Sequence, residues 1–172
     1  MKTKHLIQEL QETDHYKDFK SKNPDTFFSA VFLILDLENK TEQIQLDYFL
    51  PQQNQIAAFE HPWTEPKIHD DIISVGKSGE TEPGEIKPMQ EQTSEIKIDI
   101  DDLESISKEK IKENKSSIVP TKIIAILKND QWNLTCMDNA LGIVRIKLDA
   151  ITGKSQDFNK GSLMDFMGIR KK

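Results

Sequence analysis

The sequence has almost no cysteine, no long apolar run and no excess of positive charge. Cys136 is the only cysteine among 172 residues, so no internal disulfide can form and nothing points to an oxidising compartment. The longest apolar run, 27–35, is too short to span a bilayer. Residues 1–17 lack the apolar stretch of a signal peptide. We therefore expect a cytoplasmic protein without a membrane span.

The balance of charge argues against nucleic acid as a partner. The formal net charge is -6, with 36% hydrophobic and 30% charged residues. The lysines are scattered among acids, and no basic stripe alternates with aromatic residues. We expect a soluble chain of one domain or two small ones, with a modest core under a charged surface.

Motifs for catalysis, cofactors and metals are missing or incomplete. Gly76-Lys77-Ser78 lacks the earlier glycine of a phosphate-binding loop, because Asp71 stands there, and no helix pattern follows. The metal-capable residues of 61–71 match no common ligand spacing; they are His61, His69, Asp70 and Asp71. The acids of 99–104 lack the central glycine of a calcium loop. We predict no catalytic, cofactor-binding or metal-ligating residues and no cofactor, and the protein is interpreted as a non-enzyme.

The first part of the chain reads as a helix followed by a meander. Leu6, Ile7 and Leu10 share one face of a helix expected from residue 3 to about 20, which Asn23-Pro24 ends. Strands are expected at 26–37, 43–50 and 56–59, where β-branched and aromatic residues occur and apolar residues partly alternate with polar ones. These elements define a first unit, 1–61.

A second unit is predicted after a connection rich in proline and glycine. The connection covers 62–95, and 71–75 is its one candidate strand. The second unit, 96–158, begins with a short alternating strand at 96–100. A helix then starts near Asp101 or Asp102, where an acid can cap free N–H groups. Three alternating strands follow between 121 and 150, and 159–172 remains as a C-terminal tail.

One stretch of this second unit predicts both a core face and a turn. The residues expected to line one sheet face against a helix are Trp132, Leu134, Val144, Ile146 and Leu148. At the end of the strand, Asp149 can accept hydrogen bonds from the turn that follows, and Gly153 can supply a positive φ.

The same stretch resembles a known family. Trp132, the alternating "WNLTCMD" (132–138), the turn "NALG" (139–142) and above all "IVRIKLDAITGK" (143–154) resemble the PepSY-like family, over residues 96–158. The resemblance implies a cystatin-like α+β unit with a binding or peptidase-inhibiting role, and it brings no catalytic residues.

The two halves also resemble each other. Each runs helix, proline, antiparallel strands, and each holds a related tetrapeptide, "IQLD" at 44–47 and "IKLD" at 146–149. The chain is either a tandem of two helix-plus-meander units packed together, each with its own sheet, or two stretches that share a topology by chance. The fold class expected is α+β with antiparallel meanders, each preceded by a helix.

The tail is the one candidate site. Leu163, Phe166 and Met167 would share one face of a short helix, with Ile169 nearby. This face either packs on a sheet, of its own chain or of a second copy in a homodimer, or docks onto a protein or peptide partner. We therefore expect a non-catalytic binding or regulatory module acting through protein or peptide contacts. The alternative is a small-molecule-binding protein or enzyme with a pocket between helix and curved sheet.

Overall fold

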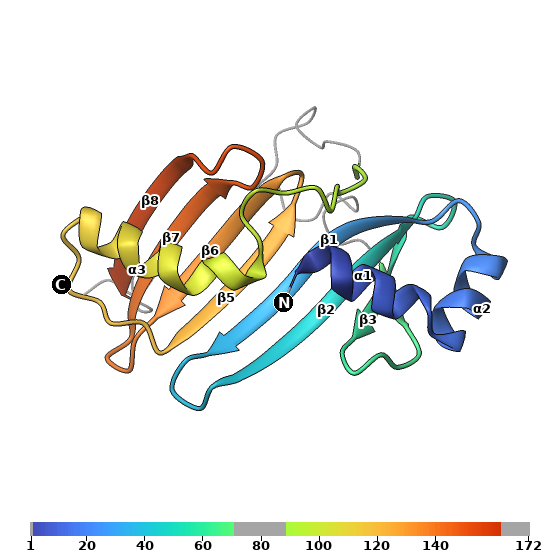
Figure 1. Cartoon of the computed structure of the whole chain (residues 1–172), viewed down its shortest axis with the longest axis horizontal. Coiled ribbons are helices and arrows are strands. Elements are labelled where there is room, and N and C mark those ends of the chain that lie inside the picture. The colour runs from blue at the N-terminus through green and yellow to red at the C-terminus, as the bar shows by residue number, and fades with distance from the viewer. Residues whose placement is uncertain (1, 71–88, 163–172) are drawn as a thin grey trace.

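The structure, a computed structural model, describes residues 2–70 and 89–162 (Figure 1). Its N-terminal half comprises α1 (Thr3–Gln11), α2 (Asp14–Lys22), β1 (Phe27–Asp36), β2 (Thr41–Leu50), β3 (Gln55–Glu60) and β4 (Lys67–Asp70). Its C-terminal half comprises the 3-10 helix η1 (Ile100–Asp102), α3 (Leu103–Glu113), β5 (Lys122–Lys128), β6 (Gln131–Met137), β7 (Gly142–Asp149) and β8 (Ser155–Ser162).

All the described strands form one eight-stranded antiparallel sheet in the order β4-β3-β2-β1-β5-β6-β7-β8. The predicted α+β class is confirmed, with helices preceding each meander. The expectation of a separate sheet for each half was wrong. β1 and β5 pair from Ala30 opposite Lys128 to Asp36 opposite Lys122. The halves therefore share a sheet because their first strands satisfy each other's backbone hydrogen bonds.

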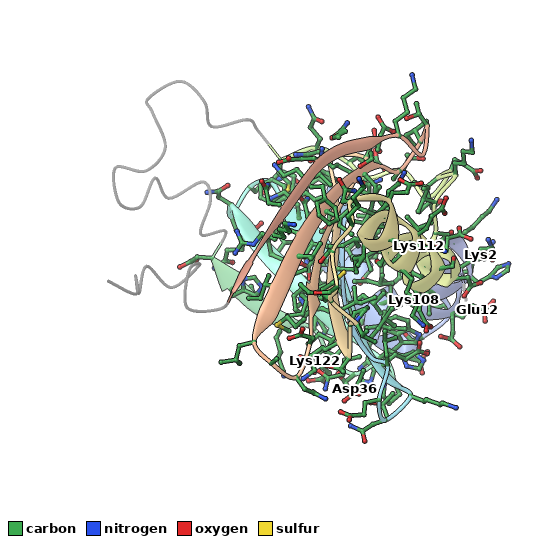
Figure 2. All side chains as sticks on the ribbon, turned by 90° about the vertical axis from the view of Figure 1, so that its left-hand side faces the viewer. Lys2, Glu12, Asp36, Lys108, Lys112 and Lys122 are labelled. Carbon is green, nitrogen blue, oxygen red and sulfur yellow. The ribbon has the colours of Figure 1, made fainter. Side chains whose placement is uncertain are left out.

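The helices lie on one face of this sheet, which we call the covered face. Figure 1 shows α1 in front of the N-terminal strands and α3 in front of the C-terminal ones. Figure 2 shows the sheet nearly edge-on, with Lys108 and Lys112 of α3 on the helix side. The helices contribute Leu6, Leu10, Tyr16, Phe19, Leu103 and Ile111 to the core.

The predicted core face of the C-terminal half is confirmed. Trp132, Leu134, Val144, Ile146 and Leu148 are all buried in the core cluster, together with Cys136. The Trp132 indole N–H donates to the Ile98 carbonyl at 2.8 Å. Burial raises the pKa of the Cys136 thiol to about 11, so Cys136 behaves as a small apolar residue.

The predicted helix from residue 3 to about 20 is two helices. The Thr13 hydroxyl donates to the Leu10 carbonyl at 2.7 Å and accepts the Tyr16 backbone N–H at 3.2 Å. Thr13 therefore closes α1 and caps α2 at once. The change of direction explains why Tyr16 and Phe19 lie off the apolar stripe of the first helix: in α2 both are buried, against the rings of Tyr48 and Phe59.

The predicted strand at 96–100 was also wrong. The Lys97 and Ile98 backbone N–H groups both donate to the Ala150 carbonyl, so this segment is fixed to a turn and does not pair with a strand. The cap of the following helical segment is Asp99, two or three residues before the predicted start at Asp101 or Asp102. Asp99 Oδ1 accepts the Ile100 N–H at 2.8 Å, and the Asp102 carboxylate accepts the Asp99 N–H at 2.9 Å.

Two edge strands had no prediction of their own. β4 lies inside the predicted connection 62–95, and β8 crosses the predicted boundary between residues 158 and 159. Both are polar and mostly exposed, so neither shows the alternation that marks a half-buried strand. The candidate strand 71–75 and the Gly76-Lys77-Ser78 motif lie outside the described residues.

The two related tetrapeptides do not occupy equivalent strands. "IQLD" lies on β2, the second strand of its half, whereas "IKLD" lies on β7, the third strand of its half. Counted from the central pair β1 and β5, β2 corresponds to β6. The sequence similarity between 44–47 and 146–149 therefore carries no support for a repeat.

The turn after β7 is built as predicted. Asp149 Oδ1 accepts the backbone N–H groups of Ile151 at 2.8 Å and Thr152 at 2.9 Å. The N–H groups of Thr152 and Ile151 hold the pKa of this carboxyl below its ordinary value. Gly153 has φ +81°, a conformation in which a side chain would be strained.

Candidate docking surface

The face of the sheet opposite the helices, which we call the open face, is not covered by any helix within residues 2–70 and 89–162. Its centre carries an apolar stripe of Phe32, Ile34, Ile124 and Ile126. Ile34 pairs with Ile124 and Phe32 with Ile126 across the junction of β1 and β5. Ile126 is 37% exposed and the other three are half-buried. Near the ends of the same face, Phe49, Ala58 and Ile143 are buried.

The stripe arises because β1 and β5 are apolar on both faces. Val31 and Leu33 of β1 and Ile123 and Ala125 of β5 point into the core, and the residues between them point to the open face. A pair of central strands in an antiparallel sheet commonly has one polar face. The consecutive apolar residues of 30–35 and 123–127 were the sequence signal for this stripe, but they do not reveal that the two strands are neighbours.

Charge divides the open face into two flanks. Cross-strand pairing places Asp36, Asp47 and Glu60 on the N-terminal flank, with Lys67. It places Lys122, Lys128, Arg145 and Lys147 on the C-terminal flank, with Asp149 and Asp157. We call the N-terminal flank the acidic flank and the C-terminal flank the basic flank. They lie on opposite sides of the apolar stripe. Asp36 and Lys122 mark their boundary at one end of β1 and β5 (Figure 2).

Asp47 is a half-buried acid of the acidic flank. Its Oδ1 accepts a hydrogen bond from Gln45 Nε2 at 2.8 Å. Burial raises the pKa of the Asp47 carboxyl, and the hydrogen bond from Gln45 opposes that rise only in part. Burial therefore disfavours the charged form of the Asp47 side chain.

A shallow hollow lies on each flank of the stripe. The hollow on the acidic flank, about 190 Å³, is lined by Phe32, Gln43, Gln45 and Glu60 among others. The hollow on the basic flank, about 320 Å³, is lined by Asn133, Thr135, Arg145 and Lys147 among others. Side chains from a partner could enter both, because each opens beside the apolar stripe and offers amide or charged groups.

The covered face has a cavity of about 590 Å³ between the helices of the N-terminal half, β1 and residues 91–94. Tyr48 lies at this cavity and is 2% exposed, and its hydroxyl has no hydrogen-bond partner within the described residues. Burial raises the pKa of the Tyr48 hydroxyl, and the neighbouring Tyr16 side chain raises it further, although the two hydroxyls do not meet in hydrogen-bond geometry. A buried hydroxyl without a partner costs stability, and a ligand could supply that partner.

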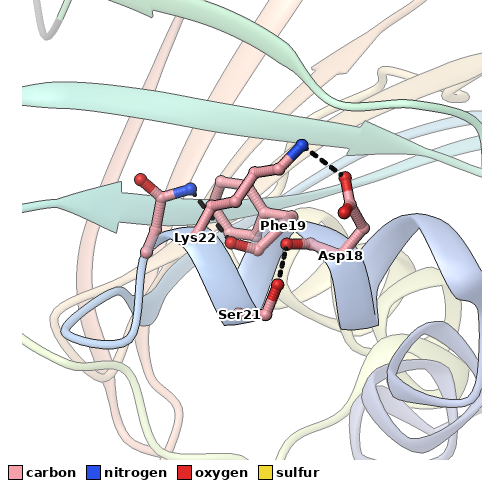
Figure 3. A network of polar contacts seen from close by, with 5 residues as sticks. Asp18, Phe19, Ser21 and Lys22 are labelled. Carbon is pink, nitrogen blue, oxygen red and sulfur yellow. Dashed lines mark hydrogen bonds and ion pairs between the residues drawn. The ribbon is translucent and has the colours of Figure 1, made fainter.

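A larger cavity, about 670 Å³, opens beside α2. Figure 3 shows that Asp18 and Lys22, two of its lining residues, contact each other within α2. Lys22 Nζ lies 3.0 Å from an Asp18 carboxylate oxygen, and Asn23 Nδ2 donates to the Phe19 carbonyl at 2.9 Å. These contacts end and stabilise the helix, so this cavity carries less indication of a ligand.

The candidate residues of the tail lie outside the described residues. These are Leu163, Phe166, Met167 and Ile169. Of the metal-capable set, Asp71 is also outside, and His61 lies 3.6 Å from the Glu9 carboxylate. No group of His, Cys, Asp and Glu side chains in residues 2–70 and 89–162 could hold a metal ion. None of the helices described there is long and apolar enough to cross a membrane.

Comparison with known proteins gives one similar structure. No protein-family model matches the chain, and no curated protein matches it. The fold is similar to the crystal structure of a protein from Clostridium difficile 630 described as a "putative lipoprotein". The TM-score is 0.50 and the identity 15%, over 86% of this chain and 91% of that chain. At this identity the likeness concerns the fold alone.

Proposed function

We propose that the protein is a non-catalytic binding or regulatory module that acts through protein or peptide contacts on the open face. The observation that carries the proposal is the contrast between the two sides of the sheet. One side is filled by helices and core residues. The other presents the apolar stripe between an acidic and a basic flank. Exposed apolar surface with a polar rim is typical of a protein-binding site.

The flanks define the chemistry of the partner. It would place apolar side chains on Phe32, Ile34 and Ile126, with basic groups toward Glu60 and acidic groups toward Lys147. Complementary charges on both sides of an apolar centre fix orientation and reject partners of the wrong polarity.

A library of displayed random peptides, selected on the immobilised full-length protein, tests this function. We expect enriched peptides to combine apolar residues with charges at the two ends. Ile126→Asp should weaken binding of a synthesised peptide at least about tenfold by calorimetry, because it places a charge in the stripe. Val119→Asp is the matched control, since Val119 is 74% exposed and outside the sheet. Peptide binding that survives Ile126→Asp would refute a site on the open face.

The PepSY-like resemblance of residues 96–158 supports the same class of function. The resemblance implies a cystatin-like unit with a binding or peptidase-inhibiting role, and we propose that both halves are variants of such a unit. The similar structure from Clostridium difficile is described as a "putative lipoprotein", and that description concerns that protein alone. For this chain we keep the proposal of a cytoplasmic location, which rests on its sequence.

The cavity at Tyr48 favours a second candidate, a small-molecule-binding protein or enzyme. The hydroxyl of Tyr48 and the nearby Lys20 and Glu91 could hold a small polar ligand. Native mass spectrometry of the purified protein would show a bound mass that Tyr48→Phe abolishes. If Tyr48→Phe is instead neutral or stabilising and no bound mass exists, the hydroxyl is a cost of packing and this candidate fails.

A further inference from the structure

We infer that the partner of the open face is a second copy of this chain, in a face-to-face dimer whose two-fold axis runs along β1 and β5. This inference rests on the proposed function and names the partner for the same surface. The sheet order places β1 and β5 at the centre, with the remaining strands distributed evenly on both sides. A half-turn about an axis parallel to the central strands therefore lays β1 over β5, β2 over β6 and β3 over β7 of the partner.

This arrangement keeps the strand directions of the two sheets aligned, which is one of the two ways in which sheets pack face to face. It also packs the apolar stripe of one chain against the apolar stripe of the other. Ile34 and Ile124 pair within one chain, so each would lie over the other residue of the partner chain. Phe32 and Ile126 would do the same. Such an interface is isologous, because each contact occurs twice.

The charges decide between the possible two-fold axes. An axis across the strands would place the acidic flank on the acidic flank of the partner. An axis along the strands places the acidic flank on the basic flank. Glu60 and Lys147 show this most clearly. Cross-strand pairing connects them in one row across the sheet, from Glu60 through Gln45, Phe32, Ile126 and Asn133 to Lys147. Glu60 on β3 and Lys147 on β7 each lie on the third strand from the centre of the sheet. Glu60 of one copy would then face Lys147 of the other, twice per dimer.

The hollows beside the stripe follow the same symmetry. Gln43 and Gln45 line one hollow, and Thr135 and Asn133 line the other. Gln43 shares a row with Thr135, and Gln45 shares a row with Asn133. The dimer would thus place amide and hydroxyl groups opposite amide groups on both sides of its apolar centre, where they can exchange hydrogen bonds or hold bridging water.

Zero-length carbodiimide cross-linking of the wild-type protein tests this geometry directly. Within one chain, Glu60 and Lys147 are separated by about 24 Å, from the spacing of five neighbouring strand pairs, so an amide bond between them must join two copies. Mass spectrometry of mixed light and nitrogen-15-labelled protein should find the Glu60–Lys147 link between chains. Glu60 also lies 3.2 Å from Lys67 within the chain. The Glu60–Lys67 link is therefore the internal control for the reaction.

Sedimentation equilibrium with charge-exchanged variants supplies the second measurement. Glu60→Lys and Lys147→Glu should each raise the dimer dissociation constant about tenfold, because each alters two symmetric contacts. The double variant should restore it to within about threefold. Ile126→Asp should sediment as a monomer, and its circular dichroism spectrum should show that it is folded. Val119→Asp should sediment as a dimer like the wild type.

A wild-type protein that stays monomeric up to about 0.2 mM would overturn the inference, and so would a dimer that Ile126→Asp leaves intact. A dimer lacking the Glu60–Lys147 link would overturn the axis and with it the proposal. None of these results refutes the binding function, because peptide binding to the dilute protein and its loss in Ile126→Asp are measured independently. A monomer that binds selected peptides would assign the open face to a foreign partner.

Discussion

The two faces of the sheet are made of alternate residues of the same strands, and they differ in what constrains them. On the covered face, Ile146 and its neighbours are fully enclosed by helices and strands. On the open face, Ile126 occupies a similar strand position but is 37% exposed. The covered face is thus determined by the need to bury a core. Apolar residues on the open face contribute little to that core and remain free to bind a partner.

The covered face also depends on one polar residue that joins the halves. Asp99 Oδ1 accepts both the backbone N–H and the hydroxyl of Thr3, at 2.9 and 2.7 Å, across 96 residues of sequence. The same oxygen accepts the Ile100 N–H. The start of α1 and the start of the segment leading into α3 are therefore held at a single carboxylate, and Asp99 is itself buried.

The largest expected effect is a difference in stability between two isoleucine-to-alanine variants, one on each face of the sheet. Ile146→Ala should reduce the free energy of unfolding by about 2–5 kcal/mol, because it leaves a cavity in the core. Ile126→Ala should cost less than about 1 kcal/mol in dilute protein, because solvent can fill the space. Urea unfolding measures both. Equal costs would mean that the open face is as enclosed as the covered one.

Removing the carboxylate that joins the halves should have the next largest effect. Asp99→Ala should cost about 2–3 kcal/mol, because it leaves the Thr3 and Ile100 donors without their acceptor. Thr3→Ser is the matched control, since a serine retains both donors to Asp99 and should cost less than about 1 kcal/mol. A loss below 1 kcal/mol for Asp99→Ala would show that water replaces the carboxylate and that the pairing of β1 with β5 and the shared core suffice to hold the halves together.

A smaller effect, of opposite sign, is expected on the open face. Because the folded pKa of Asp47 lies above its unfolded value, ionisation of this group opposes folding, and its cost appears as the pH rises through the folded pKa. Asp47→Asn should therefore raise the melting temperature at pH 7 by a few degrees at most. At about pH 3 the wild type is mostly protonated and the two proteins should melt together. A variant less stable than wild type at pH 7 would show that the hydrogen bond from Gln45 and the neighbouring charges stabilise the ionised carboxylate more than burial penalises it.

The smallest effect concerns the turn after β7. The folded pKa of Asp149 lies below its ordinary value, so its contribution to stability is present above the unfolded pKa and is lost as the pH falls through the folded pKa. Asp149→Asn should lower the melting temperature slightly at pH 7, and the difference should shrink toward pH 2. A difference independent of pH would assign the role of Asp149 to hydrogen-bond geometry and not to its charge.

The candidate surface could be predicted only in part. The consecutive apolar residues of 30–35 predict a strand with two apolar faces, but Ile34 and Ile124 become one stripe only when β1 and β5 pair. The tail residues that the sequence did single out, from Leu163 to Ile169, remain a prediction. Conversely, the pattern of 96–100 predicted a strand because it alternates, whereas its backbone bonds go to Ala150 and its apolar side chains fill the core.

The sequence by itself determined the local features whose causes are local. Alternation along 131–149 set which side chains enter the core, and Asp149 with Gly153 set the turn that follows, because both depend on residues a few positions apart. Only the tertiary structure decided the union of two meanders into one sheet. Backbone hydrogen bonds join β1 to β5 whatever their side chains, so no motif encodes which strand will be the neighbour. The division of the open face into acidic and basic flanks follows from the same pairing, which is why it could not be read from the chain alone.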